Sequence, residues 1–234
     1  MDYVIALAGN PNTGKSTVFN ALTGMNQHTG NWPGKTVAQA TGSYVHNHKK
    51  YTLVDLPGTY SLLAASVEEQ IARDFLLFND PQATIVVVDA TCLERNLNLV
   101  LQILEITGRV VVCVNLMDEA SRKGLMLNTA VLERELGVPI IPTVARRGRG
   151  LEELKEAVAA IADGQIQTNP CRIKYPQTIE QAVAILSEKL QPLLKNALKR
   201  RWAALRLLDG DDTVLAALAD YLVNNNREEG TVTV

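Results

Sequence analysis

The chain has 234 residues, of which 47% are hydrophobic and 21% charged, and this balance excludes a wholly disordered chain, a collagen-like repeat and a disulfide scaffold. Its 23 basic and 25 acidic side chains give a net charge of -2, which argues against a polycation that binds nucleic acid by charge alone. No apolar run is long enough to cross a bilayer, and the N-terminus has no secretory-signal pattern, so we expect a cytoplasmic chain.

Apolar runs alternate with amphipathic patterns through the first two thirds of the chain. The runs predict strands at 3–8, 43–46, 51–54, 84–88, 110–114 and 138–141. Helical spacing of apolar residues predicts helices at 16–22, 67–78, 93–106, 129–136 and 151–161. This alternation predicts an α/β fold, with a mostly parallel sheet, one antiparallel hairpin strand and helices on both faces.

After residue 164 the strand pattern stops. A polar stretch with two prolines follows, and then only helical patterns, at 179–190, 202–208 and 214–222. We expect Pro192 to kink or divide the first of these helices. The sequence therefore predicts an α/β domain at 1–164, a small all-helical domain at 165–226 and a disordered tail at 227–234.

Residues 9–16 read GNPNTGKS and match the phosphate-binding pattern G-x-x-x-x-G-K-[ST] between a predicted strand and a predicted helix. Glycines let backbone N–H groups turn toward phosphate oxygens, and the helix N-terminus adds its positive dipole. In this pattern Lys15 reaches the β- and γ-phosphates and Ser16 ligates Mg²⁺. The residues expected to surround the phosphates are Gly9, Asn10, Pro11, Asn12, Thr13, Gly14, Lys15, Ser16 and Thr17.

A second motif, Asp55-Leu56-Pro57-Gly58, follows the predicted strand at 51–54. A carboxylate at this place holds Mg²⁺ through water, and the Gly58 N–H contacts the γ-phosphate. Taken alone the pattern is weak, because an aspartate that ends a strand before a turn is common.

A third motif, Asn115-Leu116-Met117-Asp118, follows the predicted strand at 110–114 and fits N-x-x-D. In this pattern the aspartate accepts hydrogen bonds from the N1–H and the 2-amino group of guanine. Adenine lacks both donors, so the motif favours guanine nucleotides.

A glycine- and proline-rich loop at 30–37 suits a segment that becomes ordered around a γ-phosphate. There we expect Gly34, Lys35 and Thr36 at the nucleotide, with Thr36 as a second Mg²⁺ ligand, and Val144 and Ala145 near the base. In this order on these strands, the motifs jointly predict a GTPase.

The spelling of the motifs resembles one family. GNPNTGKS at 9–16, GNWPGKTV at 30–37, DLPGTYSL at 55–62 and DATCLERNL at 89–97 resemble the FeoB family, the bacterial ferrous iron transport proteins B. The resemblance runs from about residue 3 to residue 151, and the helical segment after it is similar in kind. It implies a cytosolic GTP-binding domain and a helical domain of the nucleotide-dissociation-inhibitor kind, ahead of an iron-transporting membrane region.

The resemblance also implies partners and a location. The implied partners are GTP, GDP and the membrane transport region of the same polypeptide, which this sequence lacks; homo-oligomerisation stays open, and no nucleic acid is expected. We therefore interpret the chain as the regulatory N-terminal part of a ferrous iron transporter, at the cytoplasmic face of the bacterial inner membrane. The alternative is a stand-alone GTPase of ribosome assembly or tRNA modification, and a third hypothesis is ATP-dependent phosphorylation of a small molecule.

Intrinsic hydrolysis is expected to be slow, because Thr59 follows D-x-x-G where many GTPases carry a glutamine that orients water. The resemblance implies that Asn12 helps to bind K⁺ beside the phosphates, with the carbonyls of Gly30 and Trp32, and that this cation stabilises developing charge. Asn12 can also be explained as a turn residue that tolerates the left-handed conformation. The residues expected to carry catalysis are Asn12, Lys15, Thr36 and Gly58, and those expected to hold Mg²⁺ are Ser16, Thr36 and Asp55.

Two departures from common GTPase motifs bear on affinity. Leu116 replaces the lysine of N-K-x-D, and Val144-Ala145-Arg146 stands where Ser-Ala-Lys is common. These replacements predict fewer contacts to the base, and therefore weak nucleotide affinity and rapid GDP release.

A basic run without an intervening acid lies in the predicted helical domain. Its members are Lys195, Lys199, Arg200, Arg201 and Arg206. It is typical of a solvated helix face, and a surface for a membrane or an acidic partner is the other interpretation.

Overall fold

The structure is a computed structural model that describes residues 2–25, 27–63 and 65–229. The chain divides into two compact units, the first made of residues 1–104 and 108–171 and the second of 105–107 and 172–234. The boundary between the units therefore falls after Cys171. The sequence pattern predicts a boundary seven residues earlier, after residue 164. The intervening segment is held to the first unit, since Asn169 N donates to Gly137 O at 3.0 Å and Cys171 N to Leu136 O at 2.9 Å.

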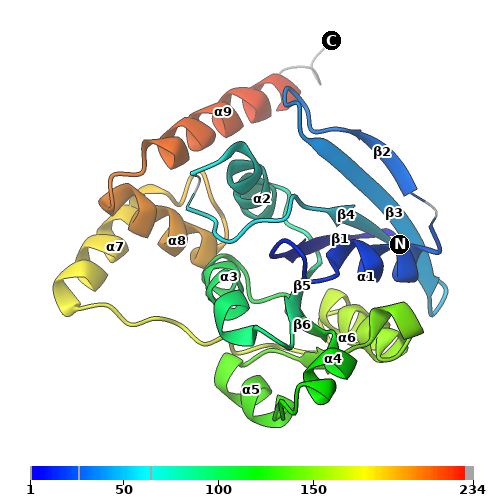
Figure 1. The fold of residues 1–234 in the computed structure, drawn as a ribbon. Coiled ribbons are helices and arrows are strands. Elements are labelled where there is room, and N and C mark those ends of the chain that lie inside the picture. Colours follow the sequence, from blue (N-terminus) through cyan, green and yellow to red (C-terminus); the bar gives the residue numbers. More distant parts are fainter. Residues whose placement is uncertain (1, 26, 64, 230–234) are drawn as a thin grey trace. The chain divides into compact units, whose positions relative to one another are not determined.

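A mixed sheet forms the first unit (Figure 1), with seven strands in the part of the chain that the structure describes, in the order β2-β3-β4-β1-β5-β6-β7. The strands are β1 (Asp2–Gly9), β2 (Gln27–Asn31), β3 (Ala38–His46), β4 (Lys49–Asp55), β5 (Ala83–Asp89), β6 (Val110–Asn115) and β7 (Ile140–Pro142). β3 pairs antiparallel with β2 and β4, and the remaining strand pairs are parallel. The prediction of one antiparallel strand in a mostly parallel sheet is confirmed.

The central strands of the sheet are buried on both faces. The elements that accompany it are α1 (Lys15–Thr23), α2 (Val67–Phe78), α3 (Leu93–Ile106), α4 (Met117–Arg122), α5 (Thr129–Leu136), the 3₁₀ helix η1 (Ala145–Arg147) and α6 (Leu151–Ala162). Phe19 of α1 and Leu154 of α6 pack in one cluster with Ile85 of the sheet. The alternate strand residues Val86 and Val112 point to the other face and are also fully buried. Burial on both faces explains the near-continuous apolar runs of β5 and β6.

The sequence pattern misses β2 and α4 and shifts β7. Residues 27–31 read QHTGN and carry no apolar alternation, so β2 exists through its ladder with β3. α4 is six residues long and follows Leu116, whose φ of 62° is left-handed. β7 begins at Ile140 and not at residue 138, because Pro139 has no N–H to give to a ladder.

The second unit contains α7 (Gln177–Lys189), α8 (Ala197–Leu208) and α9 (Asp212–Glu229). Its buried apolar side chains include Val183, Leu190, Leu194, Trp202, Ala203, Val214 and Leu218. Pro192 lies in the turn between α7 and α8, so it separates two helices instead of kinking one. Across the described ranges, every helix is too short or too polar to cross a bilayer.

α9 continues to Glu229, so residues 227–229 of the predicted tail are described as helix in this structure. Glycine and proline are absent from residues 212–229, so no residue stops the helix there. The rest of the predicted tail, 230–234, lies outside the described residues.

Candidate nucleotide site

The predicted motifs follow strands that are neighbours in the sheet. Gly9 ends β1, Asp55 ends β4 and Asn115 ends β6, and the order β4-β1-β5-β6 is parallel throughout. Carboxyl ends of parallel strands lie at the same edge of a sheet, which is where open α/β sheets bind ligands. Backbone bonds join the motifs there, because Leu56 N donates to Leu7 O at 2.9 Å and Thr59 N to Gly9 O at 3.3 Å.

The loop between β1 and α1 is tightly turned. Asn12 and Gly14 have φ values of 67° and 79°, both left-handed. A Cβ on Gly9 would lie 2.6 Å from Val87 O, and one on Gly14 would lie 2.4 Å from Asn115 Nδ2. These close approaches require glycine at both positions and leave the N-terminus of α1 open at Lys15 and Ser16.

Lys15 and Asp55 form an ion pair in this structure. Lys15 Nζ donates to Asp55 Oδ1 and also to Leu56 O, at 2.8 Å in the second case. Burial raises the pKa of Asp55, and the neighbouring Lys15 acts against that rise. The two charges therefore compensate one another at the place where phosphates and a cation are expected to meet them.

The D-x-x-G turn lies against the phosphate loop. A Cβ on Gly58 would stand 3.6 Å from the backbone of Pro11, which brings the Gly58 turn and the loop into near contact. Thr59 is 6% exposed, and its hydroxyl donates to Ser61 O at 2.7 Å. The Thr59 hydroxyl is thus engaged in a hydrogen bond within its own turn.

Asn115 connects three segments of the site. Its Nδ2 donates to Thr13 O at 3.1 Å, while its Oδ1 accepts from Ala145 N at 3.1 Å and from Thr143 Oγ1 at 3.3 Å. The residue is 2% exposed. Asn115 belongs to the motif that is predicted to favour guanine, and its side chain holds the phosphate loop beside the loop after β7.

Asp118, in the first turn of α4, forms an ion pair with Arg146. The sequence alone does not predict a partner for this arginine. Arg146 NH2 donates to Asp118 Oδ2 at 2.5 Å, and Arg147 Nε lies 3.9 Å from the same oxygen. The hydrogen bond from Arg146 holds the pKa of Asp118 below its usual value. Val144 and Ala145, expected near the base, directly precede Arg146. Spacing alone could not reveal this pair, although the cluster of arginines at 146, 147 and 149 was a signal.

The loop at 30–37 is anchored at both ends. Gly30 is paired with Gln39 in the β2–β3 ladder, Trp32 N donates to Val37 O at 2.9 Å, and Lys35 N donates to Trp32 O at 2.9 Å. The Trp32 ring packs edge-on against Phe75 of α2, with centroids 5.7 Å apart. Gly34, Lys35 and Thr36 are exposed at the tip. The carbonyl of Trp32, expected at K⁺, is engaged in this turn.

The donor set fits Mg²⁺ only in company with phosphates. Within the described residues, no group of three or more His, Cys, Asp or Glu side chains could hold a metal. Ser16 and Thr36 offer exposed hydroxyls, and Asp55 offers one carboxylate. Mg²⁺ usually binds one or two carboxylates together with waters and substrate phosphates, so this sparse set of oxygen donors suits it.

Two family models match the chain in succession. The model described as ferrous iron transport protein B matches residues 3–158, and the FeoB cytosolic helical domain matches residues 175–231. The chain belongs to the FeoB family. The expected family resemblance is confirmed, and both structural units have counterparts in FeoB proteins.

Named relatives agree with this assignment. The Fe(2+) transporter FeoB of Escherichia coli K12 is 41% identical over 211 residues, which cover 88% of this chain and 27% of that protein. A Porphyromonas gingivalis protein described as a fusion of Fe(2+) transport protein A and Fe(2+) transporter FeoB is 42% identical over 211 residues, covering 88% of this chain and 25% of its own length. This FeoB chain therefore spans about a quarter of these relatives.

Solved FeoB structures share the fold. The cytosolic domain of the T. maritima FeoB iron transporter in apo form superposes with a TM-score of 0.83 at 37% identity, over 94% of this chain and 86% of that one. The L. pneumophila cytosolic domain gives a TM-score of 0.80 at 34% identity, over 93% of both chains. The T. maritima domain was also solved in a GMPPNP form.

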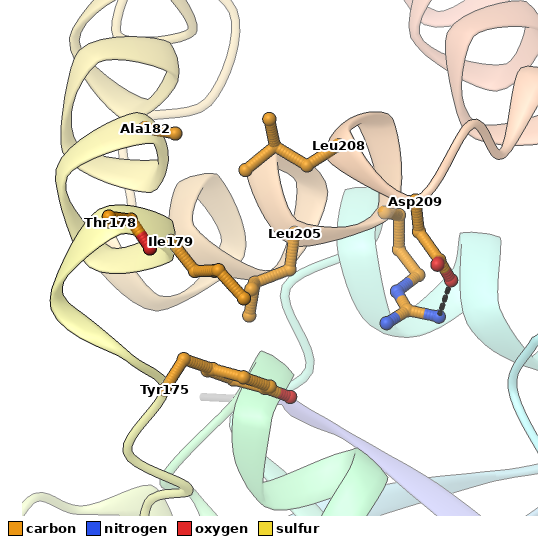
Figure 2. Close-up of a pocket in the computed structure, with 8 residues that line it drawn as sticks. Tyr175, Thr178, Ile179, Ala182, Leu205, Leu208 and Asp209 are labelled. Atoms are coloured by element: carbon orange, nitrogen blue, oxygen red, sulfur yellow. Dashed lines mark hydrogen bonds and ion pairs between the residues drawn. The ribbon is translucent and has the colours of Figure 1, made fainter.

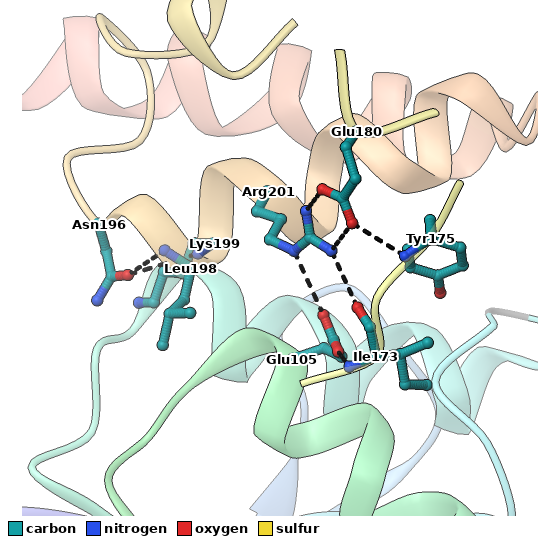
Figure 3. Close-up of polar contacts among 8 residues, drawn as sticks. All are labelled: Glu105, Ile173, Tyr175, Glu180, Asn196, Leu198, Lys199 and Arg201. Carbon is teal, nitrogen blue, oxygen red and sulfur yellow. Dashed lines mark hydrogen bonds and ion pairs between the residues drawn. The ribbon is translucent and has the colours of Figure 1, made fainter. Parts of the chain in front are cut away.

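The basic run of this FeoB chain is largely engaged inside the helical unit (Figure 3). Arg201 donates to Glu180 Oε2 at 2.5 Å, and its Nε lies 3.9 Å from Glu105 Oε2. Arg200 donates to the carbonyl of Lys195 at 2.6 Å, and Lys199 is 5% exposed. Lys195 is exposed, whereas the other four members of the run are buried or half-buried, so the run as a whole is not a simple solvated helix face.

The helical unit also carries a cavity of about 370 Å³ between α7 and α8. Figure 2 shows Ile179 and Leu205 directed toward one another, with Tyr175 below them and Asp209 at one end. Asp209 Oδ2 accepts a hydrogen bond from the Arg206 guanidinium at 3.2 Å. No sequence pattern pointed to this cavity, because its wall is assembled from side chains of two helices.

Proposed function

We propose that this chain binds GTP with Mg²⁺ and hydrolyses it, as the regulatory cytosolic part of a bacterial ferrous iron transporter. The observation that carries the proposal is the placement of the GNPNTGKS loop, Asp55 and the Asn115–Asp118 motif at one edge of the sheet in a FeoB-family chain. The relatives named above are Fe(2+) transporters, which favours this function over a ribosome-assembly or tRNA-modification GTPase.

We assign each role to a residue of the motifs. Lys15 and the amides of 12–17 hold phosphates, Ser16 and Thr36 ligate Mg²⁺, and Asp55 supports the metal through water. Bound Mg²⁺ neutralises charge that develops on the phosphate oxygens. Once phosphates are present, Lys15 leaves Asp55 and donates to them, and the Gly58 N–H, in the turn beside Pro11, donates to the γ-phosphate.

Base choice is the sharpest test of this proposal. Asp118→Asn exchanges a carboxylate acceptor for an amide, so GDP binding is expected to weaken at least tenfold and XDP binding to strengthen, because xanthine presents an acceptor where guanine has its 2-amino donor. Equilibrium titrations with GDP, ADP and XDP measure the change, with Glu133→Gln on the exposed face of α5 as a control. Unaltered preference in Asp118→Asn, or ADP binding as tight as GDP binding, would contradict a guanine site.

Hydrolysis is proposed to depend on K⁺ near Asn12. Thr59 cannot orient water as a glutamine does, because its hydroxyl donates to Ser61 O, so the transition state needs another source of positive charge. Asn12 is exposed at the turn of the phosphate loop, where its carboxamide can reach a cation. Phosphate release is expected to be faster in KCl than in NaCl, and Asn12→Ala is expected to lose this difference; equal rates in all four reactions would refute the role.

The named relatives are Fe(2+) transport proteins, and this chain matches about a quarter of their length. We place the chain at the cytoplasmic face of the inner membrane, joined to a membrane region that carries Fe²⁺. In the full-length protein, Lys15→Ala is expected to abolish GTP-dependent Fe²⁺ uptake while leaving the protein in the membrane. Uptake at the wild-type rate would disconnect this site from transport.

A further inference from the structure

We propose that Arg146 is an internal competitor of guanine for Asp118 and thereby sets the affinity of the site for nucleotide. The inference rests on the proposed guanine-nucleotide function and deepens it, because it assigns a specificity residue that the N-x-x-D motif does not contain. Arg146 lies 28 residues from Asp118 along the chain and reaches it from the segment that follows β7.

The geometry of the pair is one-sided. Arg146 NH2 donates to Asp118 Oδ2 at 2.5 Å, with Arg147 Nε at 3.9 Å from the same oxygen. Asp118 Oδ1 is buried and, among the atoms that the structure describes, has no hydrogen-bond partner. The Asp118 side chain is 14% exposed and that of Arg146 is 48% exposed. The carboxylate is thus fixed and partly covered, while the arginine approaches from the solvent side.

The chemistry of the two ligands is alike. A guanidinium presents N–H donors side by side in a plane, and the N1–H and 2-amino group of guanine form a similar planar pair of donors. Both match the two oxygens of a carboxylate, and a carboxylate held by one of them cannot present the same oxygens to the other. Arg146 therefore holds one of the two carboxylate oxygens of Asp118 that the base would need.

The backbone around Arg146 is fixed, so only the side chain has to move. Ala145 N is held by Asn115 Oδ1 at 3.1 Å, Val144 N donates to Arg149 O at 3.1 Å, and Gly148 N closes the turn on Ala145 O at 3.1 Å. The guanidinium can leave Asp118 by rotation about its own exposed side-chain bonds. Nucleotide binding then selects the molecules in which Arg146 has swung away.

This equilibrium has a defined cost in affinity. When only a fraction of the molecules is competent to bind, the apparent Kd equals the intrinsic Kd divided by that fraction. A partly exposed ion pair typically favours its paired state by a factor of up to about fivefold, and the competent fraction falls by about the same factor. The proposed rapid release of GDP has the same origin, because Arg146 can reclaim Asp118 as the base departs.

The direction of the change in GDP affinity distinguishes competition by Arg146 from a general effect of its positive charge. Nucleotides are polyanions, so removal of a nearby positive charge normally weakens their binding. Arg149 supplies the matched control, since it is an exposed arginine of the same loop whose backbone oxygen accepts from Val144 N. Competition predicts that Arg146→Ala binds GDP about two- to fivefold more tightly than wild type, and that Arg149→Ala binds it equally or more weakly.

The experiment is a set of equilibrium and stopped-flow titrations of GDP against wild type, Arg146→Ala and Arg149→Ala at fixed KCl and Mg²⁺. The ratio of the wild-type Kd to the Arg146→Ala Kd should fall toward one as choline chloride is added, because salt screens the exposed pair. In an Asp118→Asn background titrated with XDP, Arg146→Ala should change Kd less than twofold, since the carboxylate is gone. Thermal unfolding of each variant checks that it is folded.

Three results would overturn the proposal. These are unchanged or weaker GDP binding in Arg146→Ala, an equal gain in Arg149→Ala, and an undiminished effect of Arg146→Ala in the Asp118→Asn background. Weaker binding would show that Arg146 supports the bound base. A wild-type chain that bound no guanine nucleotide at all would refute the proposed function itself, which distinguishes that failure from a failure of the competition.

Discussion

Asn115 is 2% exposed, and its carboxamide joins the phosphate loop, the end of β6 and the loop after β7 through Thr13 O, Thr143 Oγ1 and Ala145 N. Removing one partner of a buried hydrogen bond leaves the other unsatisfied, which costs more than the bond itself contributes. The residue thus acts on the nucleotide through the position of the loops around it.

Asn115→Ala is expected to lower the free energy of unfolding by about 1–3 kcal/mol, because Thr13 O and Ala145 N lose their buried partner. It should also weaken GDP binding, since the phosphate loop is released from β6. Urea denaturation and GDP titration measure the two effects. The control is Asn98→Ala on the exposed surface of α3, which should stay within about 0.5 kcal/mol of wild type. A stable Asn115→Ala with unaltered GDP binding would refute the positioning role.

At this scale, motif spacing predicted where most candidate site residues lie in the fold but not what they touch. Lys15 and Asp55 were each expected at the phosphates and the metal, and the structure pairs them with one another. Arg146 could not be assigned a partner from the sequence, because its contact with Asp118 depends on how β6 and β7 align in the sheet. Contacts between segments distant in sequence follow from packing, which a local pattern does not contain.

The end of α5 shows how an element fixes the segment that leaves the first unit. α5 begins at the cap Asn128, whose side chain accepts from Val131 N at 3.1 Å, and it ends at Gly137, whose φ is 70°. A Cβ at Gly137 would lie 1.8 Å from Asn169 O. The glycine therefore permits both the left-handed cap and the close passage of residues 168–171.

Gly137→Ala is expected to destabilise the fold by more than about 2 kcal/mol, because it adds a backbone clash to the usual cost of about 1 kcal/mol for a left-handed alanine. Gly124→Ala is the matched control, since Gly124 has a φ of 71° but nothing within 4 Å of its Cβ position, so it should lose only the conformational part. Denaturant unfolding compares the two variants. Equal losses would show that the contact with Asn169 is unimportant.

Elements were predicted from the sequence as far as they carry their own apolar pattern. The helices at 67–78, 93–106 and 129–136 have the predicted bounds, because amphipathic spacing and capping residues such as Ser66 and Asn128 mark them locally. β2 was missed because QHTGN gains its strand conformation from β3. The sequence does not predict the extension of α9 to Glu229, because the last residues of this helix are polar and carry no apolar helical spacing.

Over the whole molecule, the two units are linked through chain segments that cross the boundary. α3 begins after β5 in the first unit, and its last residues, from Glu105, belong to the second. In the second unit Glu105 accepts from Ile173 N at 3.0 Å and lies 3.9 Å from Arg201 Nε, so the end of α3 joins the start of the helical unit and α8 (Figure 3). Arg201 and Glu180 complete this cluster.

The Glu180–Arg201 pair predicts a specific acid sensitivity. Hydrogen bonding to Arg201, aided by Tyr175 N, lowers the pKa of Glu180 from 4.5 to about 2. Because the folded value lies below the unfolded one, the pair stabilises the fold fully above about pH 4.5 and loses that contribution as the pH falls toward 2. Glu180→Gln lacks the titrating group and should be less stable than wild type at neutral pH.

The difference in thermal unfolding temperature between wild type and Glu180→Gln should therefore shrink as the pH is lowered from neutral toward about 2. Glu188→Gln, on the exposed surface of the same helix α7, should follow the wild-type curve throughout. Because Glu180 is 35% exposed, solvent screens part of the interaction, and added salt should also reduce the difference at neutral pH. A difference that stays constant from neutral to acid pH would mean that packing, and not the charge of Glu180, holds α7 to α8.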